Sequence, residues 1–345
     1  MIKVENLKSG GDVTRTWKTE GEKEGDLSAY FCSCNWGKKS VALDLSSSTG
    51  KEIIQKLAGQ SEIVIVSYKP GDAEKLGVSY QQLSTNNQQL IYGQITGYGS
   101  DNDRVGYDAV IQAEAGFMDM NGEADGPPTK MPVALIDVLA GHQLKEGLLL
   151  ALLKRERTGE GSFVEVSLIH TAIASLANQA TNWLVAGKLP TRKGSAHPNI
   201  APYGDSFLTQ DGKRILMAVG SDRQFEDLTK VLGIGQEALG NKFSTNQERV
   251  QDRVALNQLL EERMAKVDSK VFLEKVAQKK IPAGVIQNLK EVFEMKEAVE
   301  LLINRNGLMG IKNFVGKDTG YQLPVTGLLS PPHFGEHTDE ILSRL

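Results

Sequence analysis

The sequence predicts an α/β protein with an open, Rossmann-like parallel sheet, accompanied by a smaller α+β domain. Two observations favour this fold. Between Val41 and about Ser167, short β-rich runs alternate with helical segments, an order typical of parallel βαβ units. Further on, the Gly-, Pro- and Ser-rich segment GKLPTRKGSAHPNIAPYGD interrupts all hydrophobic periodicity and so indicates a domain boundary.

The first half of the chain alternates strand and helix. The runs VALDL, EIVIV and LIYGQI predict strands, because they are rich in aliphatic and β-branched residues. A helix follows SSSTG, with Ser48 or Thr49 as its cap and Gly59 at its end, and two short helical turns precede LIYGQI. The chain opens on a strand already under way, Ile2 to Glu5, so we expect it to lack the first βα unit of a doubly wound fold.

Two long helices come next. They run from Asp137 to about Arg157 and from Leu168 to about Ala186, on either side of the turn and strand in TGEGSFVEVS.

The second half predicts a small α+β unit. A hairpin in YGDSFLTQDGKRILMAVG turns at Asp211 and Gly212, while SDRQFEDLTKVLGI and residues 246–280 have helical periodicity. From about Gly307 the pattern indicates strand and coil. We therefore predict a large α/β domain over residues 1–187, a linker with a glycine-containing loop over 188–203, a small α+β domain over 204–300, and a C-terminal segment over 301–345 that returns to the large domain.

The charge pattern argues against nucleic-acid and membrane partners. Charged residues make up 24% of the chain, the net charge is −4, and no long Lys/Arg run offers the clustered positive charge that nucleic-acid binding needs. No apolar run reaches the roughly 18 to 20 residues that span a bilayer, and the start MIKVENLKSGGD lacks a signal-peptide core. We expect a cytoplasmic protein, or the mature form of an organelle enzyme such as one of the mitochondrial matrix.

No metal site is expected from the histidines and cysteines. Cys32 and Cys34, the only cysteines, lie two apart in what reads as a strand, and no second pair completes a metal site. His142 and His197 lack suitably spaced carboxylates, so a structural role is the simpler interpretation of each.

The candidate ligand loops follow two of the predicted strands. Ligands of open α/β sheets bind beyond the carboxyl ends of the strands, which here are followed by SYKPGD and TGYGSDNDRVGYD. Within the second loop, Tyr107 is either a packed aromatic or a site residue, and Asp108 is either a helix cap or a site residue.

Asp137 interrupts the apolar run PVALIDVLAG and then begins a helix. An Asp at a helix start is commonly an N-cap. A partly desolvated carboxylate near a helix N-terminus also stays ionised and suits covalent nucleophilic catalysis. Both interpretations stay open, and they can hold together.

The chain resembles the class III CoA-transferases, the CaiB/BaiF family. The resemblance rests on ordered blocks along essentially the whole chain: KVE with GGDVTRTW, NWGKKSVALDL, the KPG of SYKPG, ITGYG, RVGYDAVIQAEAG, DGPPTKMPVALIDVLAG, RERTGEGSFVEVSL, AHPNIAPYG, AVGSDRQF, IPAGVI and GEHTDEIL. Within the family, the blocks TRTW, ITGYG and GYDAV look most like those of succinyl-CoA:glutarate CoA-transferases.

The resemblance implies a large CoA-binding α/β domain, a smaller domain and an interlocked homodimer. It places the catalytic aspartate at Asp137, which would move CoA from an acyl-CoA to a small carboxylic acid through an aspartyl anhydride and an aspartyl-CoA thioester. Backbone N–H groups of the loop at 194–204 would stabilise the oxyanions.

For CoA itself, the resemblance implies a set of contacts in the VALDL strand, in the two candidate loops and just after the first of these loops. These contacts are Leu43, Ser67, Tyr68, Lys69, Lys75, Arg104, Tyr107 and Asp108.

Two features depart from the family pattern. Members usually begin earlier, with a strand, a helix and a strand that help to bind the nucleotide, and the basic residue common just after KVE is here Asn6. The alternatives are the α-methylacyl-CoA racemase branch, whose GHD motif here reads GYD at Tyr107, and a non-catalytic CoA-binding dimer scaffold with a short N-terminus.

Overall fold

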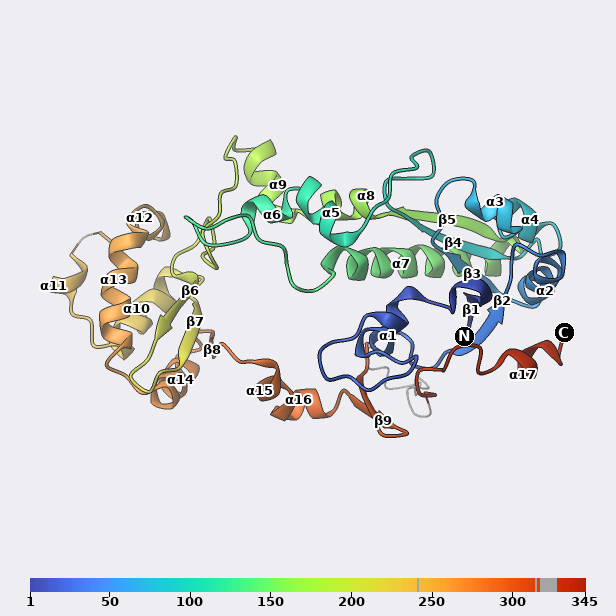
Figure 1. Ribbon diagram of the computed structural model, residues 1–345. Coiled ribbons are helices and arrows are strands. Elements are labelled where there is room, and N and C mark those ends of the chain that lie inside the picture. The colour runs from blue at the N-terminus through green and yellow to red at the C-terminus, as the bar shows by residue number, and fades with distance from the viewer. Residues whose placement is uncertain (241, 314, 317–327) are drawn as a thin grey trace. The chain divides into compact units, whose positions relative to one another are not determined.

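The computed structural model describes residues 1–240, 242–313, 315–316 and 328–345 (Figure 1). Its contacts divide the chain into two compact units. The first contains Met1–Gly106, Asp137–Thr171 and Val292–Leu345, and the second contains Tyr107–Ile136 and Ala172–Glu291. Each unit is described by itself.

The first unit is built on parallel strands, as the alternating pattern predicted. β1 (Ile2–Asn6) pairs with β2 (Lys39–Leu43), and β4 (Ile91–Thr96) lies between β3 (Ile63–Val66) and β5 (Ser162–Ser167). The expected mixed α/β class is therefore confirmed. Among the described residues, however, hydrogen bonding groups these strands into two sheets rather than one continuous sheet.

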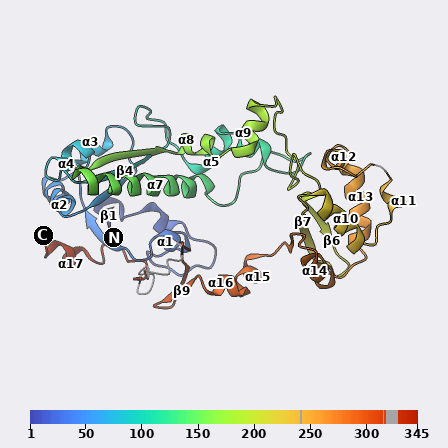
Figure 2. The ribbon, with the colours of Figure 1, turned by 180° about the vertical axis from the view of Figure 1, so that it is seen from behind.

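Helix α7 (Leu135–Thr158) packs along the three-stranded sheet of the first unit (Figures 1 and 2). Its Leu144 and Leu148 lie in a buried cluster with Ile91 of β4. The approach is close at Gly147, because a Cβ there would lie 2.6 Å from the Val164 Cγ1 of β5. The middle of this helix is thus packed closely against the strands.

Shorter helices of the first unit follow the predicted order. α2 spans Ser48–Gly59 and is capped by Ser47, one residue before the predicted caps. Cys32 and Cys34 lie in α1 (Ala29–Cys34), so the strand predicted around them was wrong. The other helices before β4 are η1 (Leu7–Ser9), η2 (Val13–Thr16), α3 (Asp72–Leu76) and α4 (Tyr80–Ser84).

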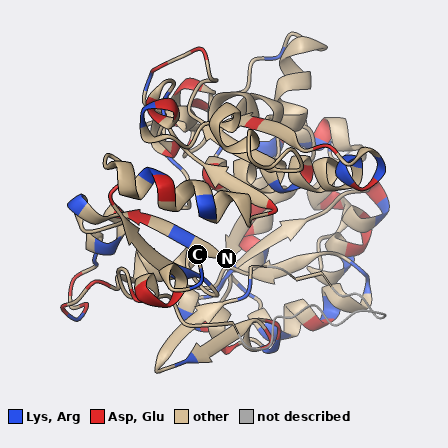
Figure 3. Ribbon diagram, turned by 90° about the vertical axis from the view of Figure 1, so that its right-hand side faces the viewer, with Lys and Arg blue, Asp and Glu red and all other residues tan. Residues whose placement is uncertain are grey.

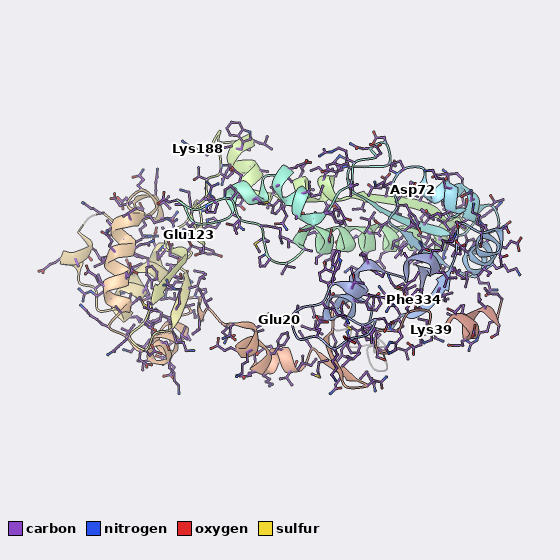
Figure 4. All side chains as sticks on the ribbon, in the orientation of Figure 1. Glu20, Lys39, Asp72, Glu123, Lys188 and Phe334 are labelled. Carbon is purple, nitrogen blue, oxygen red and sulfur yellow. The ribbon has the colours of Figure 1, made fainter. Side chains whose placement is uncertain are left out.

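The C-terminal residues 292–345 belong to the first unit. The Lys39 Nζ of β2 donates to Glu340 at 2.6 Å, and the Phe334 N–H donates to Asp26 at 2.6 Å (Figure 4 labels Lys39 and Phe334). The elements of this segment are α16 (Lys296–Val299), β9 (Leu302–Arg305), β10 (Leu308–Ile311) and α17 (Thr338–Leu342). Part of the predicted segment 301–345 lies outside the described residues.

The second unit contains an antiparallel sheet covered by helices. β6 (Tyr203–Leu208), β7 (Arg214–Ala218) and β8 (Ala283–Val285) pair in that order, and the turn at Asp211 and Gly212 lies where it was predicted. Buried side chains of the sheet, among them Ile215 and Met217, pack against the helices. The helices of this part are α10 (Asp222–Val231), α11 (Gln236–Leu239), α12 (Asn246–Gln251), α13 (Arg253–Met264) and α14 (Ser269–Gln278). The division between the two units falls within α15 (Leu289–Glu294).

The compact units differ in extent from the segments predicted from the sequence. Residues 107–136, which carry α5 (Asp108–Glu114) and α6 (Phe117–Met120), group with the second unit. They are held there because the Gly194 N–H donates to the Gly122 carbonyl at 2.9 Å and Arg192 donates to the Asp119 carbonyl at 2.8 Å.

The single helix predicted over residues 168–186 is divided into two. α8 (Leu168–Ala174) and α9 (Ala177–Leu184) are separated where Ala177 takes a positive φ of 49°. The left-handed Ala177 is the first residue of the second helix, and neither Gly nor Pro marks the break in the sequence. No described helix is both long enough and apolar enough to cross a membrane.

Candidate functional site

A pocket of about 190 Å³ lies at the carboxyl end of β2 in the first unit. Apolar side chains form much of its wall, namely Val4, Leu43, Leu45, Tyr68 and Leu76. Leu43 is the last residue of β2 and Tyr68 follows β3, so two of the predicted CoA contacts line one pocket. Its position beyond the strand ends is the one expected for a ligand of an α/β sheet.

Polar groups border this pocket, and one of them was missed by the sequence analysis. Lys8 lines the pocket and donates from Nζ to the Ser46 Oγ at 2.6 Å and to Asp44 at 3.1 Å. The Ser46 hydroxyl, followed by Lys8, holds the pKa of Asp44 below its ordinary value. The resemblance expected a basic residue at the position of Asn6, and Lys8 lies only two residues further along the chain. This proximity is the sequence signal from which Lys8 could have been predicted.

The SYKPGD loop places its cations outside the pocket lining. Ser67 and Lys69 are exposed on either side of Tyr68, whose phenol is half-buried with a pKa raised by burial. Lys75 is exposed on α3, where it pairs with Asp72 at 3.0 Å (Figure 4 labels Asp72). Of the residues predicted in this loop and helix, only Tyr68 lines the pocket.

In the loop after β4 the backbone passes very close to itself at Gly97 and Gly106. A Cβ on Gly97 would lie 2.7 Å from the Gly106 backbone, and one on Gly106 would lie 2.5 Å from the Gly97 Cα. Between them, the Arg104 guanidinium lies over the Tyr98 ring at 4.1 Å from its centroid. Arg104 is therefore an exposed cation on a loop with little freedom to move.

Tyr107 and Asp108 have different environments. Tyr107 is 65% exposed and is the N-cap residue of α5, so it is not the packed aromatic that one interpretation expected. Asp108 is buried, with 7% exposure. Its Oδ1 accepts from the Gln112 Nε2 at 2.6 Å, and its Oδ2 accepts from the Ile136 N–H at 2.7 Å. Asp108 thus caps the helix α7 rather than its own helix.

Asp137 is the third residue of α7 and is exposed. The helix begins at Leu135, so Asp137 lies inside the helix, and the N-cap interpretation, one of the two left open for this residue, does not hold. Its carboxylate instead belongs to the first helical turn, where the helix dipole favours a negative charge.

His142 and His197 each contact a neighbouring side chain. On α7, one turn after Asp137, the His142 Nδ1 lies 2.9 Å from the Lys145 Nζ. In the second unit the His197 ring makes an edge contact with Tyr203, at 5.2 Å between ring centroids. Among residues 1–240, 242–313, 315–316 and 328–345, no cluster of three potential ligands suits a metal ion.

Several backbone N–H groups of the loop at 194–204 already donate hydrogen bonds within the protein. The N–H groups of His197, Ala201 and Tyr203 donate to the Tyr203 carbonyl, the Asn246 Oδ1 and the Asp205 Oδ2 respectively. These donors are already engaged, so they are poor candidates for the oxyanion contacts expected from the resemblance.

Two arginines hold the same loop through its carbonyl groups. Arg253 donates to the carbonyls of His197 and Ile200 at 2.5 and 2.6 Å, and the fully buried Arg249 donates to the Ala201 carbonyl at 2.9 Å. The loop is therefore fastened within the second unit.

A sequence model of CoA-transferase family III matches residues 1–338. The chain therefore belongs to this family, and the expectation of a CoA-transferase, an enzyme that uses CoA thioesters as substrates, is confirmed.

Named relatives and solved structures agree with this assignment. The chain is 34% identical to a succinate–glutarate CoA-transferase of Agrobacterium fabrum, over 100% of this chain and 88% of the relative. It is 32% identical to the human succinyl-CoA:glutarate CoA-transferase, over 100% of this chain and 79% of the relative. A CaiB/BaiF family protein from Brucella suis has a TM-score of 0.82 at 37% identity, covering 99% of this chain and 91% of the other. Rv3272 of M. tuberculosis has a TM-score of 0.84 at 28% identity, covering 98% and 90%.

Proposed function

We propose that the chain transfers CoA from an acyl-CoA to a free carboxylic acid, with Asp137 as the covalent nucleophile. The observation that carries this proposal is an exposed carboxylate in the first turn of α7, a helix otherwise packed on the sheet. A carboxylate at this end of a helix is stabilised as an anion, the form that attacks.

The reaction runs through two kinds of aspartyl intermediate. Asp137 attacks the donor thioester carbonyl and expels CoA thiolate, which leaves a mixed anhydride. The thiolate then attacks the aspartyl carbonyl, releases the donor acid and forms an aspartyl-CoA thioester. The acceptor carboxylate attacks that thioester and expels the thiolate again, which finally attacks the acceptor acyl carbonyl and frees Asp137.

The pocket at the end of β2 supports binding of the nucleotide part of CoA. Its apolar wall, with Leu43 and Tyr68, suits a flat heteroaromatic ring, while Lys8 at the border suits a phosphate. We propose that Ser67, Lys69, Lys75, Arg104 and Tyr107 contact the rest of CoA, as the resemblance implies. Binding energy gained at the nucleotide would help to hold the thioester in place for attack.

The acids exchanged are proposed to be small dicarboxylates. The relatives carry names such as succinate–glutarate CoA-transferase and acetyl-CoA:oxalate CoA-transferase, whose acids are mostly of this kind. Succinyl-CoA as donor and glutarate as acceptor are the first pair to test.

A homodimer is proposed on the strength of exposed apolar side chains. On α7, Val138, Leu149 and Leu153 are exposed and recur at helical spacing on one face. In the second unit, Leu184 and Val185 at the end of α9 are also exposed, at 77% and 83%. Light scattering after size exclusion would give twice the chain mass for a dimer, and the single chain mass would contradict it.

Covalent trapping tests the proposed nucleophile. The protein is mixed with succinyl-CoA, quenched with hydroxylamine and digested, and the peptide containing Asp137 is analysed by mass spectrometry. A hydroxamate at Asp137 is expected in wild type and in Asp125→Asn, a matched variant of an exposed aspartate, and is expected to be absent in Asp137→Ala. The same three proteins are then assayed for CoA transfer to glutarate.

Other outcomes separate the alternatives. A protein that binds CoA but gives no adduct with several acyl-CoAs contradicts the transferase mechanism, and α-proton exchange in deuterium oxide then tests the racemase alternative. A protein that binds CoA but shows neither an adduct nor α-proton exchange leaves the non-catalytic scaffold. A protein that binds no CoA contradicts both enzymes and the CoA-binding scaffold.

A further inference from the structure

A buried carboxylate outside the proposed covalent step is bonded to the helix that carries Asp137. The Asp108 Oδ2 accepts from the Ile136 N–H at 2.7 Å, and Ile136 directly precedes Asp137 in the chain. The bond is short and involves a charged acceptor, so it is stronger than an ordinary backbone hydrogen bond. Both partners belong to the second unit.

A second side chain extends this connection. Gln112, which is fully buried, donates from Nε2 to the Asp108 Oδ1 at 2.6 Å and accepts at Oε1 from the Met131 N–H at 3.0 Å. Asp108 and Gln112 on α5 therefore fasten the segment 131–136 at both of its ends. We refer to these three hydrogen bonds as the α5 latch.

The latch acts on backbone that the helix itself leaves without a partner. The first four N–H groups of an α-helix have no acceptor inside the helix, and Ile136 is the second residue of α7. Without the Asp108 acceptor, the first turn would be free to fray and the carboxylate on Asp137 would move with it. Misplacement of a catalytic group by about 1 Å can cost roughly 100-fold in rate.

We propose that Asp108 is a positioning residue for Asp137, acting through the Ile136 amide, and that Gln112 sets the orientation of the Asp108 carboxylate. This inference rests on the proposed function, since it takes Asp137 as the nucleophile. It gives Asp108 a role different from the CoA contact implied by the resemblance, because both of its oxygen atoms are engaged and it is only 7% exposed.

A reversal of hydrogen-bond polarity tests the latch. In Asp108→Asn, the new Nδ2 faces the Gln112 Nε2, so two donors oppose each other, and turning the Gln112 amide would give up the Met131 bond. In Gln112→Glu, two carboxylates oppose each other. The double variant Asp108→Asn with Gln112→Glu restores every bond, because Asn keeps an acceptor for Ile136 and Glu accepts from both Asn and the Met131 N–H.

Two readouts are made on full-length protein, with Asp125→Asn as the control. Hydrogen exchange of the peptide covering 131–137 reports the latch without relying on activity. Steady-state transfer from succinyl-CoA to glutarate reports kcat and KM. For Asp108→Asn we expect faster exchange, a kcat lower by about 10- to 100-fold and a KM for succinyl-CoA within about twofold of wild type. The double variant should recover both slow exchange and most of kcat.

The proposal is overturned if Asp108→Asn speeds exchange and leaves kcat unchanged. It is also overturned if the double variant regains slow exchange while its kcat stays at the level of the single variant, since the charge on Asp108 would then matter in its own right. A wild type that transfers no CoA refutes the proposed function instead, while the exchange data still show whether the latch exists. The two failures are therefore distinguishable.

Discussion

Replacing Arg15 by methionine would remove the cation that balances a buried carboxylate in the first unit. The Arg15 guanidinium donates to both oxygen atoms of Glu5, at 2.6 and 2.9 Å, and also to the Pro332 carbonyl at 3.1 Å. It lies 3.8 Å from the centroid of the Phe31 ring. The side chains of Arg15 and Glu5 are only 3% and 1% exposed, so water has no access to the pair.

The expected cost follows from leaving the Glu5 charge without its partner. Removing one member of a buried ion pair costs about 3–5 kcal/mol of unfolding free energy. Glu5 keeps the Ser40 hydroxyl at 2.6 Å and the Asp12 N–H at 2.9 Å, which places the expectation near the lower end of that range. Because Glu5 lies on β1 and lines the pocket, CoA binding should weaken in the same variant.

The pH dependence of this cost has a defined sign. Burial raises the pKa of Glu5, but the hydrogen bonds from Arg15, Ser40 and the Asp12 N–H outweigh it and hold the pKa below its ordinary value. A depressed pKa contributes stability that is present above the unfolded value, about 4.3, and lost as the pH falls through the folded value. In Arg15→Met burial prevails and Glu5 takes up a proton more easily, so the deficit relative to wild type should shrink as the pH falls from 7 toward 5.

Urea unfolding followed by tryptophan fluorescence measures this deficit, since Trp17 and Trp36 lie in the first unit. Lys23→Met, at an exposed lysine nearby, is the control and should change the unfolding free energy by less than about 0.5 kcal/mol. The double variant Glu5→Gln with Arg15→Met should recover part of the loss. A deficit below about 1 kcal/mol at pH 7, or one that grows on acidification, would refute the reasoning.

Three further predictions concern the pocket, the sheet and the second unit. Lys8→Met should weaken CoA binding about fivefold, roughly 1 kcal/mol for an exposed cation, when measured by calorimetry, whereas Lys56→Met on α2 should not; equal affinities in the two variants would count against Lys8. Leu148→Ala should lower the unfolding free energy by about 2–5 kcal/mol, because the side chain is buried between α7 and the sheet, and a loss under about 1 kcal/mol would contradict the packing. Carboxyl NMR titration should give Asp211 a pKa of about 2, held down by the Ser269 and Thr209 hydroxyls, and Ser269→Ala should raise it; an unchanged pKa would contradict that cause.

Elements with a strong local pattern were predictable from the sequence. The strands in VALDL, EIVIV and LIYGQI were recognised because their aliphatic runs are bounded by turn residues, and the hairpin at Asp211 and Gly212 because Asp-Gly favours such turns. The break between α8 and α9 was missed, since Ala177 takes its positive φ without any local signal.

Features set by contacts between distant residues were beyond the sequence alone. That Asp108 caps α7 depends on a partner 28 residues away, and a carboxylate at the start of α5 reads locally as belonging to α5. The grouping of residues 107–136 with the second unit likewise depends on Arg192 and Gly194, far along the chain. The sequence predicted that the helix starts at Asp137, two residues after its actual start. Only the backbone geometry of the structure shows that Asp137 lies inside the first turn.

The two hydrophobic cores become complete at different times during synthesis on the ribosome. The buried core of the second unit is drawn from one continuous stretch, Ala201 to Ile281, so it can assemble as soon as that stretch has been synthesised. The first unit has to wait for the last residues of the chain, since Gly37 is bonded to the Leu329 carbonyl and Lys39 to Glu340. During translation β1 and β2 therefore remain without their C-terminal cover while more than two hundred residues are added, an interval in which chaperones have most to protect.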